Sequence, residues 1–169
     1  MAGRKITGVT LGADQVRDYF HRCFTAVDGL WFVKVEERFG FETALDIDEQ
    51  VWRVLPKIQA RKFKELTGFG DGFEAFGRCF LTKLELDGFQ FRAEGSADGR
   101  ELTVRLERCP WLAALRKAGR EHLGATIAER ICRNEYGGWA KEFGGTICFS
   151  LEAKRCAGDD CCRLHFVEE

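Results

Sequence analysis

The chain has 169 residues, a length that fits one domain with its own hydrophobic core. Hydrophobic residues make up 45% of it and charged residues 31%, a balance that excludes an intrinsically disordered chain. The formal net charge is −1, so the basic excess of nucleic-acid-binding domains is missing. No apolar run approaches the roughly 20 residues that a membrane-spanning helix needs. We therefore expect no nucleic-acid partner and no membrane partner.

The first predicted element is an amphipathic helix from about Asp14 to Arg38. Asp14 is the expected N-cap, and Gly40 is the expected stop. Gly29 lowers the helix propensity inside this run by about 1 kcal/mol, so it either permits close packing or marks a break. Apolar residues recur at spacings of three and four and form one stripe: Val16, Tyr19, Phe20, Cys23, Phe24, Val27, Leu30 and Trp31.

A second helical stretch runs from about Asp48 to Leu66. Pro56 lies inside it and should kink or divide the helix, because proline lacks the N–H that bonds back one turn. The glycine-rich segment 68–72 has the composition of a loop. The segment 73–86 that follows is interpreted as a short helix. These elements form a helical part at about 14–86.

From Gly88 onward the apolar period changes to two, which predicts β-strands. A first hairpin spans about 89–106 around the turn sequence Asp98-Gly99. Pro110 then begins a helical region that reaches Cys132, with a break at Gly119. Gly137-Gly138 is interpreted as part of the segment that leaves this helix. A second hairpin covers about 147–166. We expect a single α+β domain, with a hairpin–helix–hairpin part at about 88–169 and helices on one side of an antiparallel sheet.

The eight cysteines are the most informative excess in the composition. The opening residues Met1 to Gly8 contain no apolar stretch typical of a secretory signal, so we expect a cytoplasmic protein. Cytosolic thiols stay mostly reduced, and clustered cysteines are then more typical of metal ligands or reactive thiols than of disulfides. Six of the eight lie in the last 61 residues. The C-terminal part is therefore the first candidate for a functional site.

Four of these cysteines are placed to meet at one metal ion. Cys109 ends a predicted strand, Cys132 lies near the end of the next helix, and Cys156 and Cys162 flank a hairpin turn. A tight turn can bring two thiolates to about 2.3 Å from a tetrahedral zinc ion. We expect these four residues to bind zinc, with an iron–sulfur cluster as the alternative.

The other cysteines have simpler interpretations. Cys161 competes with Cys162 as the fourth ligand, but adjacent strand residues point to opposite faces, so only one of the two should belong to the site. No second ligand lies near Cys23, Cys79 or Cys148, which we expect to be small core residues.

The C-terminal stretch Cys156-Ala-Gly-Asp-Asp-Cys-Cys162-Arg-Leu-His-Phe166, after Cys109-Pro-Trp-Leu, resembles the end of the 4-vinyl-reductase-type small-molecule-binding domain. In phenol-sensing members of that family, three cysteines and a glutamate hold a structural zinc beside the ligand pocket. The resemblance implies that Cys109, Cys156 and Cys162 are zinc ligands here. The turn is shorter in this chain, and Glu152 lies four residues before Cys156 rather than three, so Cys132 is a possible replacement for the glutamate.

The N-terminal half has a second resemblance. Val-Asp-Gly-Leu-Trp-Phe at 27–32 and Val-Trp at 51–52 resemble bacterial cytosolic proteins grouped with L-2-amino-thiazoline-4-carboxylate hydrolase. This resemblance implies an enzyme, a hydrolase acting on a small cyclic amino-acid-like substrate through Cys or Asp chemistry. Function varies among proteins that share these folds, so both resemblances favour a fold and a site more than an activity.

The bulky rings supply a candidate ligand pocket. With 15 Phe and 4 Trp but one Met, the chain is rich in rigid rings that pack around a cavity less adaptably than Met. We expect Trp31, Trp52 and Trp111 to line a cavity between the N-terminal helices and the sheet, although filling the core is the alternative for each. Asp28 lies on an apolar stripe and needs a partner, either a ligand or an arginine such as Arg61.

Two classes of function follow from these observations. The first is a small-molecule-binding domain with a structural cysteine-ligated metal, whose partner would be a small apolar or aromatic ligand; a homodimer is one expected assembly. The second is the hydrolase. Four thiolates on one ion close the coordination shell, whereas a catalytic zinc keeps a position open for water or substrate, so the coordination pattern discriminates the two classes.

Overall fold

Four strands form one antiparallel sheet in the order β1-β2-β4-β3 in the computed structural model, which describes residues 8–169. The first hairpin consists of β1 (Gln90–Gly95) and β2 (Glu101–Arg108), and the second of β3 (Ile147–Ala153) and β4 (Cys162–Glu168). The two hairpins join because β2 pairs with β4, a register that places Leu106 opposite Cys162. The expectation about a secretory signal concerns Met1 to Gly8 and lies almost entirely outside the described residues.

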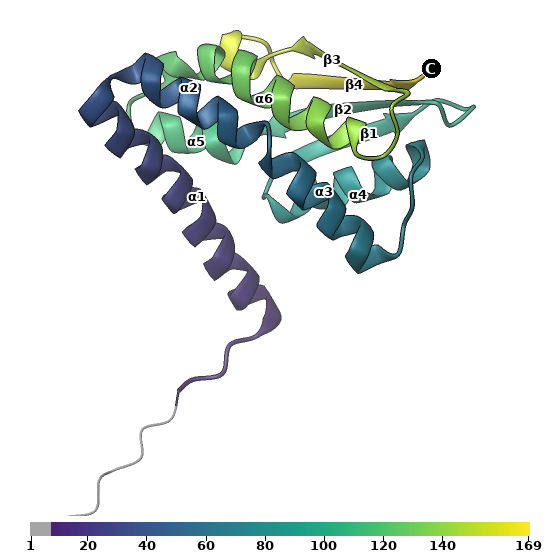
Figure 1. Ribbon diagram of the computed structural model, residues 1–169, viewed down its shortest axis with the longest axis horizontal. Coiled ribbons are helices and arrows are strands. Elements are labelled where there is room, and N and C mark those ends of the chain that lie inside the picture. Colours follow the sequence, from purple (N-terminus) through teal and green to yellow (C-terminus); the bar gives the residue numbers. More distant parts are fainter. Residues whose placement is uncertain (1–7) are drawn as a thin grey trace, which may run out of the picture.

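The helices cover one face of this sheet (Figure 1). They are α1 (Ala13–Phe39), α2 (Phe41–Trp52), α3 (Leu55–Thr67), α4 (Phe73–Leu86), α5 (Pro110–Lys117) and α6 (Gly124–Lys141), with two 3₁₀ turns, η1 (Glu121–Leu123) and η2 (Arg155–Ala157). Helices α4 and α6 contribute to the core against the strands, and α2 and α3 pack outside α6. The α+β architecture expected from the sequence is confirmed.

The core is dominated by aromatic rings. Phe76 of α4 is fully buried, and its ring lies 4.7 Å from that of Phe166 on β4 and 5.3 Å from that of Phe80. Trp139 of α6 is also fully buried and stacks on Phe143. Alternate residues of the strands complete the core, because only one face of each strand meets the helices. The ring-rich composition is thus used mainly for packing.

Helix α1 matches its predicted bounds but not its predicted environment. It runs through Gly29 without a break and ends at Gly40, whose φ of 86° favours glycine. The N-cap is Gly12 rather than Asp14, because the Gln15 side chain accepts a hydrogen bond from the Gly12 N–H. No residue of α1 is buried, so the apolar stripe does not enter the core of the chain.

Two other helices depart from the sequence expectation. The helix expected to begin at Asp48 begins instead at Phe41, and the division next to Pro56 is confirmed, with α2 ending at Trp52 and α3 beginning at Leu55. Helix α6 continues past Cys132 and through Gly137-Gly138 to Lys141, although these glycines were interpreted as an exit. A Cβ added to Gly138 would lie 3.1 Å from Pro56 Cβ, so this glycine allows α6 to approach α3 closely. The break at Gly119 is confirmed.

In the part of the chain that the structure describes, none of the helices combines the length and the apolar character needed to cross a bilayer.

Candidate functional site

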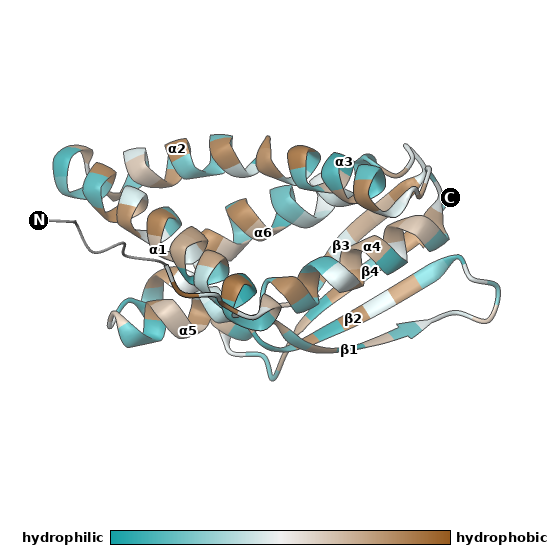
Figure 2. Ribbon diagram, turned by 90° about the horizontal axis from the view of Figure 1, so that it is seen from below, coloured by the Kyte–Doolittle hydropathy of each residue, from teal (hydrophilic) through white to brown (hydrophobic). Residues whose placement is uncertain are grey.

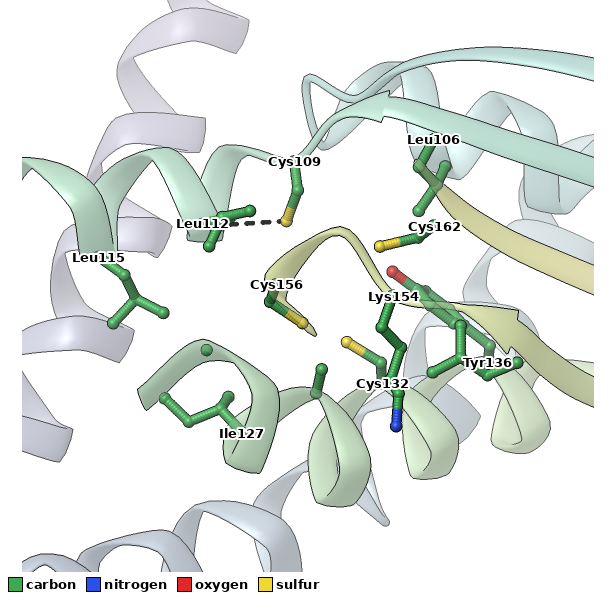
Figure 3. A pocket seen from close by; sticks show the side chains of 13 residues that line it. Leu106, Cys109, Leu112, Leu115, Ile127, Cys132, Tyr136, Lys154, Cys156 and Cys162 are labelled. Carbon is green, nitrogen blue, oxygen red and sulfur yellow. Dashed lines mark hydrogen bonds between the residues drawn. The ribbon is translucent and has the colours of Figure 1, made fainter. Parts of the chain in front are cut away.

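Four cysteines from four separate elements line one pocket (Figure 3). Cys109 directly precedes α5, Cys132 lies in the middle of α6, Cys156 lies in η2, and Cys162 begins β4. Their sulfur atoms surround a common space. The structure therefore brings together the four residues that the sequence analysis selected as metal ligands.

Local backbone geometry fixes two of the four sulfur atoms. Cys109 is the N-cap of α5, and the backbone N–H of Leu112 donates to its Sγ over 3.4 Å. The backbone N–H of Arg155 donates to Cys162 Sγ over 3.3 Å. A hydrogen bond donated to sulfur and a helix N-terminus both favour the thiolate, which is the form that binds metals. Both cysteines are thus held by contacts that suit a ligand.

A glycine allows the cysteine-bearing turn to approach α6. A Cβ added to Gly124 would lie 3.0 Å from Cys156 Cβ and 3.3 Å from Leu112 Cδ1. Contacts this short are not tolerated by real Cβ atoms unless a neighbour moves. Gly124 therefore permits the close packing of α5, α6 and η2 around the pocket.

The pocket is small and its walls are apolar. Its volume is about 60 Å³, and most of its remaining lining consists of aliphatic side chains such as Leu112, Ile127 and Leu151. Sites for small organic ligands usually occupy about 300–1,000 Å³. The cavity has room for an ion or a few water molecules rather than for such a ligand.

Burial raises the pKa of each thiol that lines the pocket. Burial brings the pKa of Cys109 to about 11. It also raises the pKa of Cys132 well above the usual range, and negative charge on Glu135 and the neighbouring cysteines raises it further. The pKa values of Cys156 and Cys162 are raised for the same main reason. Without a cation the four groups are therefore thiols, and a bound divalent ion would reverse this preference.

The side chains as they stand do not form a completed coordination shell. Among residues 8–169, no three His, Cys, Asp or Glu side chains lie close enough together to constitute a metal-binding group. The four cysteines line the walls of the cavity, so ligation requires their side chains to turn further inward. Their residue types fit zinc, because thiolates on a tetrahedral shell are its common structural ligands.

The structure separates the alternatives for the fourth ligand. Cys161 is buried but does not line this pocket, whereas its neighbour Cys162 does. Glu152 is exposed on β3 and its carboxylate faces Arg163 and His165. Cys132, rather than Glu152, therefore lines the pocket with the other three cysteines. Of the three cysteines expected in the core, Cys79 is buried, but Cys23 and Cys148 are exposed, so that expectation was wrong for these two.

Three of the four expected ligand-binding residues come together elsewhere, between α1, α2 and α5. The Trp111 indole N–H donates to Asp28 Oδ2 over 3.2 Å, and the rings of Trp52 and Trp111 meet edge to face at 6.1 Å. Trp111 also stacks on Phe89. Asp28 therefore has an indole partner rather than Arg61, which pairs with Glu142.

Three pockets within residues 8–169 are lined by other residues, and none of the three touches these tryptophans. Trp31 does not join the group, because its side chain is 69% exposed. The position of Trp31 in the apolar stripe shows that this face of α1 is apolar, but it does not show that another part of the chain covers the face. Asp28, Trp52 and Trp111 pack against one another and connect the first helices to the helix that follows Cys109.

Two groups of charged residues were missed by the sequence analysis. Asp48 lies near Asp28, and burial together with the Asp28 charge raises its pKa to about 7. Lys83 is buried in the core and forms ion pairs with Asp87, over 2.8 Å, and with Glu135. Lys83 occurs on the apolar stripe of α4, and that position was the available signal. Asp87 lies four residues further along, a spacing that helical periodicity could have indicated, whereas Glu135 lies on α6 and periodicity does not indicate it.

A larger pocket adjoins the cysteine cavity. Its volume is about 350 Å³, and it shares Cys109 and Leu112 with the smaller cavity. Its lining includes three arginines, Arg108, Arg116 and Arg155, and one carboxylate, Glu107. The pocket thus combines a few apolar side chains with an excess of cationic ones.

Comparison with known proteins gives the family of the chain. No curated protein matches it. Residues 13–162 match the model of DUF6125, described as a family of unknown function. The match extends from the start of α1 to the first residue of β4 and includes all four cysteines of the pocket. The chain belongs to the DUF6125 family.

Proposed function

We propose that this protein is a small-molecule-binding domain with a structural metal site formed by Cys109, Cys132, Cys156 and Cys162. Zinc is the preferred metal, and an iron–sulfur cluster is the alternative. One observation carries the proposal: four cysteines from three separate stretches of the sequence line a single ion-sized cavity. The cytosol, where thiols stay reduced, is the compartment that suits such a site.

A structural role for the metal is supported by the kind and number of ligands. Four thiolates fill a tetrahedral shell and leave no position for water or substrate. The walls around the ion would be mostly apolar.

The proposed metal would connect elements that otherwise meet mainly through packing. Its ligands lie at the end of β2, within α6, in η2 and at the start of β4. An ion shared by these elements would hold the two hairpins and the covering helix in register. Binding free energy at such a site adds to the free energy of folding.

The adjoining pocket of about 350 Å³ is the proposed ligand site. Its size lies within the range of small-ligand pockets, and Leu112 and Ala113 give part of its lining an apolar character. The three arginines of the lining favour a ligand that carries a carboxylate or phosphate beside an apolar or aromatic body. In this proposal Asp28, Trp52 and Trp111 hold α5 in place rather than contact the ligand.

The metal is tested by elemental analysis of protein purified under reducing, oxygen-free conditions. We expect one zinc per chain in the wild type and in Cys148→Ser, whose side chain lies outside the pocket, and less than a tenth of this in Cys132→Ser and Cys156→Ser. Iron with acid-labile sulfide would support the cluster instead. Less than a stoichiometric amount of any transition metal in the wild type would contradict the site.

The ligand site is tested with benzoate and with neutral benzyl alcohol as its matched probe. We expect benzoate to raise the melting temperature more than benzyl alcohol does, and Arg108→Ala to remove this difference. Lys117→Ala, which removes an exposed positive charge of α5 outside the pocket lining, should keep it. Equal shifts with both probes would contradict an anion-selective pocket.

A hydrolase is the second candidate, and the Asp28–Asp48 pair is the observation that favours it. A carboxyl group with a pKa of about 7 can donate or accept a proton near neutral pH. Hydrolysis of 2-amino-thiazoline-4-carboxylate by the wild type, lost in Asp48→Asn but retained in Cys156→Ser, would establish this candidate. Absence of turnover in the metal-loaded protein would leave the binding domain as the function.

A further inference from the structure

Helix α1 has two faces with opposite character. One face meets the rest of the chain through partly polar side chains: His21 contacts the Asp87 carbonyl oxygen, Asp28 accepts from Trp111, and Phe32 packs on Phe41. The part of the helix that precedes His21 extends away from the sheet and the other helices (Figure 1). The chain therefore uses the less apolar face of α1 for its own packing.

The opposite face is apolar and exposed. Val16, Phe20, Cys23, Val27 and Leu30 follow one another at spacings of four, three, four and three, and we call this row the seam. Tyr19 and Trp31 flank it, and hydrophobic residues recur along α1 in Figure 2. A 4-3 repeat is the pattern that lets one helix pack along another in a coiled coil.

The exposed area is large enough for a stable interface. Tyr19, Phe20 and Trp31 are 59%, 64% and 69% exposed, and aromatic side chains of this size carry about 150–250 Å² each, so these three offer roughly 350 Å². The remaining seam residues bring the apolar area to about 600 Å². A standard interface buries about 800 Å² per partner, of which roughly 65% is apolar in homodimers. The seam and its flanks meet this requirement.

We propose that the seam packs against the seam of a second copy of this chain, with the two α1 helices antiparallel. The row is nearly symmetric about Cys23, because Val16 and Leu30 lie seven residues on either side of it. Phe20 and Val27 lie three residues before it and four after it. An antiparallel pair therefore places Val16 of one copy near Leu30 of the other, and Phe20 near Val27. Both copies thus use the same patch, as a two-fold dimer requires.

The charge that follows the seam favours the antiparallel orientation. Lys34 occupies the next position of the 4-3 repeat after Leu30. In a parallel pair, Lys34 would face Lys34 of the other copy. In the antiparallel pair it lies beyond the apolar row, near the start of the other helix. Antiparallel helices also oppose their dipoles.

The dimer is tested by light scattering coupled to gel filtration of the full chain. We expect twice the chain mass for the wild type and the chain mass for Phe20→Glu combined with Val27→Glu, with unchanged helix content because neither side chain is buried. The matched control is Ile58→Glu with Leu66→Glu on α3, two residues that are equally exposed and apolar, and it should stay dimeric. A monomeric wild type, a dimeric seam variant or a monomeric control would each overturn the proposal.

The orientation is tested with a short bismaleimide cross-linker in the Cys23→Ser, Cys148→Ser background, which removes the two exposed cysteines. Chains carrying Val16→Cys or Leu30→Cys alone should not cross-link, whereas an equal mixture should give covalent dimers. Cross-linking of either variant with itself would overturn the antiparallel arrangement.

Discussion

Helices α1 and α4 carry apolar stripes of similar spacing, yet the chain covers only one of them. Phe76, Phe80 and Leu84 of α4 are fully buried against the sheet. In α1, Phe20, Val27 and Leu30 are more than half exposed. Helical periodicity therefore shows which face of a helix is apolar, but it does not show what covers that face.

The two ends of the chain differ in a second way. In our proposals the exposed stripe of α1 packs against a partner outside the protomer, whereas four C-terminal cysteines bind a metal ion at a pocket within it. The first region would supply one half of an interface, and the second a complete set of ligands.

Loss of the proposed metal should destabilise the C-terminal region and leave α1 unaffected. Chelation, or Cys156→Ser, is expected to cost at least about 4 kcal/mol of unfolding free energy, a fall of roughly 10 °C in Tm. Hydrogen exchange should speed up in β4 and keep its rate in α1. Cys148→Ser is the control. Unchanged Tm and exchange after complete chelation would show that the cysteines are only packing residues.

Removing one phenylalanine ring from α4 and one from α1 should change the unfolding free energy by very different amounts. Phe76→Ala removes a fully buried ring with four aromatic neighbours and is expected to cost about 3–5 kcal/mol. Phe20→Ala removes an exposed ring and should change the unfolding free energy by less than about 0.5 kcal/mol at concentrations where the chain is monomeric. Urea unfolding measures both. A cost of several kcal/mol for Phe20→Ala would place its ring in a core.

Alanine substitutions at two helical glycines should change the stability of the protein in opposite directions. Gly124→Ala forces a Cβ against Cys156 and Leu112, so we expect a loss of about 1–3 kcal/mol and reduced metal content. Gly29→Ala meets no atom within 4 Å and should stabilise the chain by about 0.5–1 kcal/mol. Thermal unfolding and elemental analysis distinguish them. A Gly124→Ala protein with full stability would contradict the close packing at the pocket.

The smallest expected effect concerns Asp48, which is only partly buried. Its pKa of about 7 in the folded state is above the ordinary value of 3.8, so the folded state holds the proton more tightly. The corresponding stabilisation is present below pH 3.8 and is lost as the pH rises through 7. Asp48→Asn should therefore have a higher unfolding free energy than the wild type at pH 8, where Asp48 is charged. At pH 4, where Asp48 of the folded wild type is protonated, the two should differ little.

Urea unfolding at the two pH values measures this difference. Asp18→Asn, which changes an exposed carboxylate of α1, should follow the wild type at both. A pH-independent effect of Asp48→Asn would contradict the raised pKa.

Much of the fold could be predicted because the signals are local. The period-two pattern and the Asp98-Gly99 turn identified the first hairpin, and Pro110 and Gly119 marked the start and the end of α5. The start of α2 was missed because Gly40 was interpreted only as a stop, although α2 begins directly after it. Glycines inside α6 were interpreted as a break, but Gly138 serves a close contact with Pro56.

The candidate site was predicted unevenly for a physical reason. The four cysteines could be selected because their number is visible in the sequence and because Cys109, Cys156 and Cys162 lie near predicted strand ends and a turn. Cys132 was expected near the end of its helix, but it lies in the middle of α6. The position of Trp31, the indole partner of Asp28 and the Asp48 carboxyl group depend on contacts between residues far apart in the chain. Neither spacing nor composition records such contacts.

X-ray absorption at the zinc edge of the purified wild-type protein tests the central claim most directly, because it reports the atoms bound to the metal. We predict four sulfur ligands at about 2.3 Å, with three in the residual metal-bound fraction of Cys132→Ser. Zinc bound mainly by nitrogen or oxygen, or four sulfur ligands retained in Cys132→Ser, would contradict it.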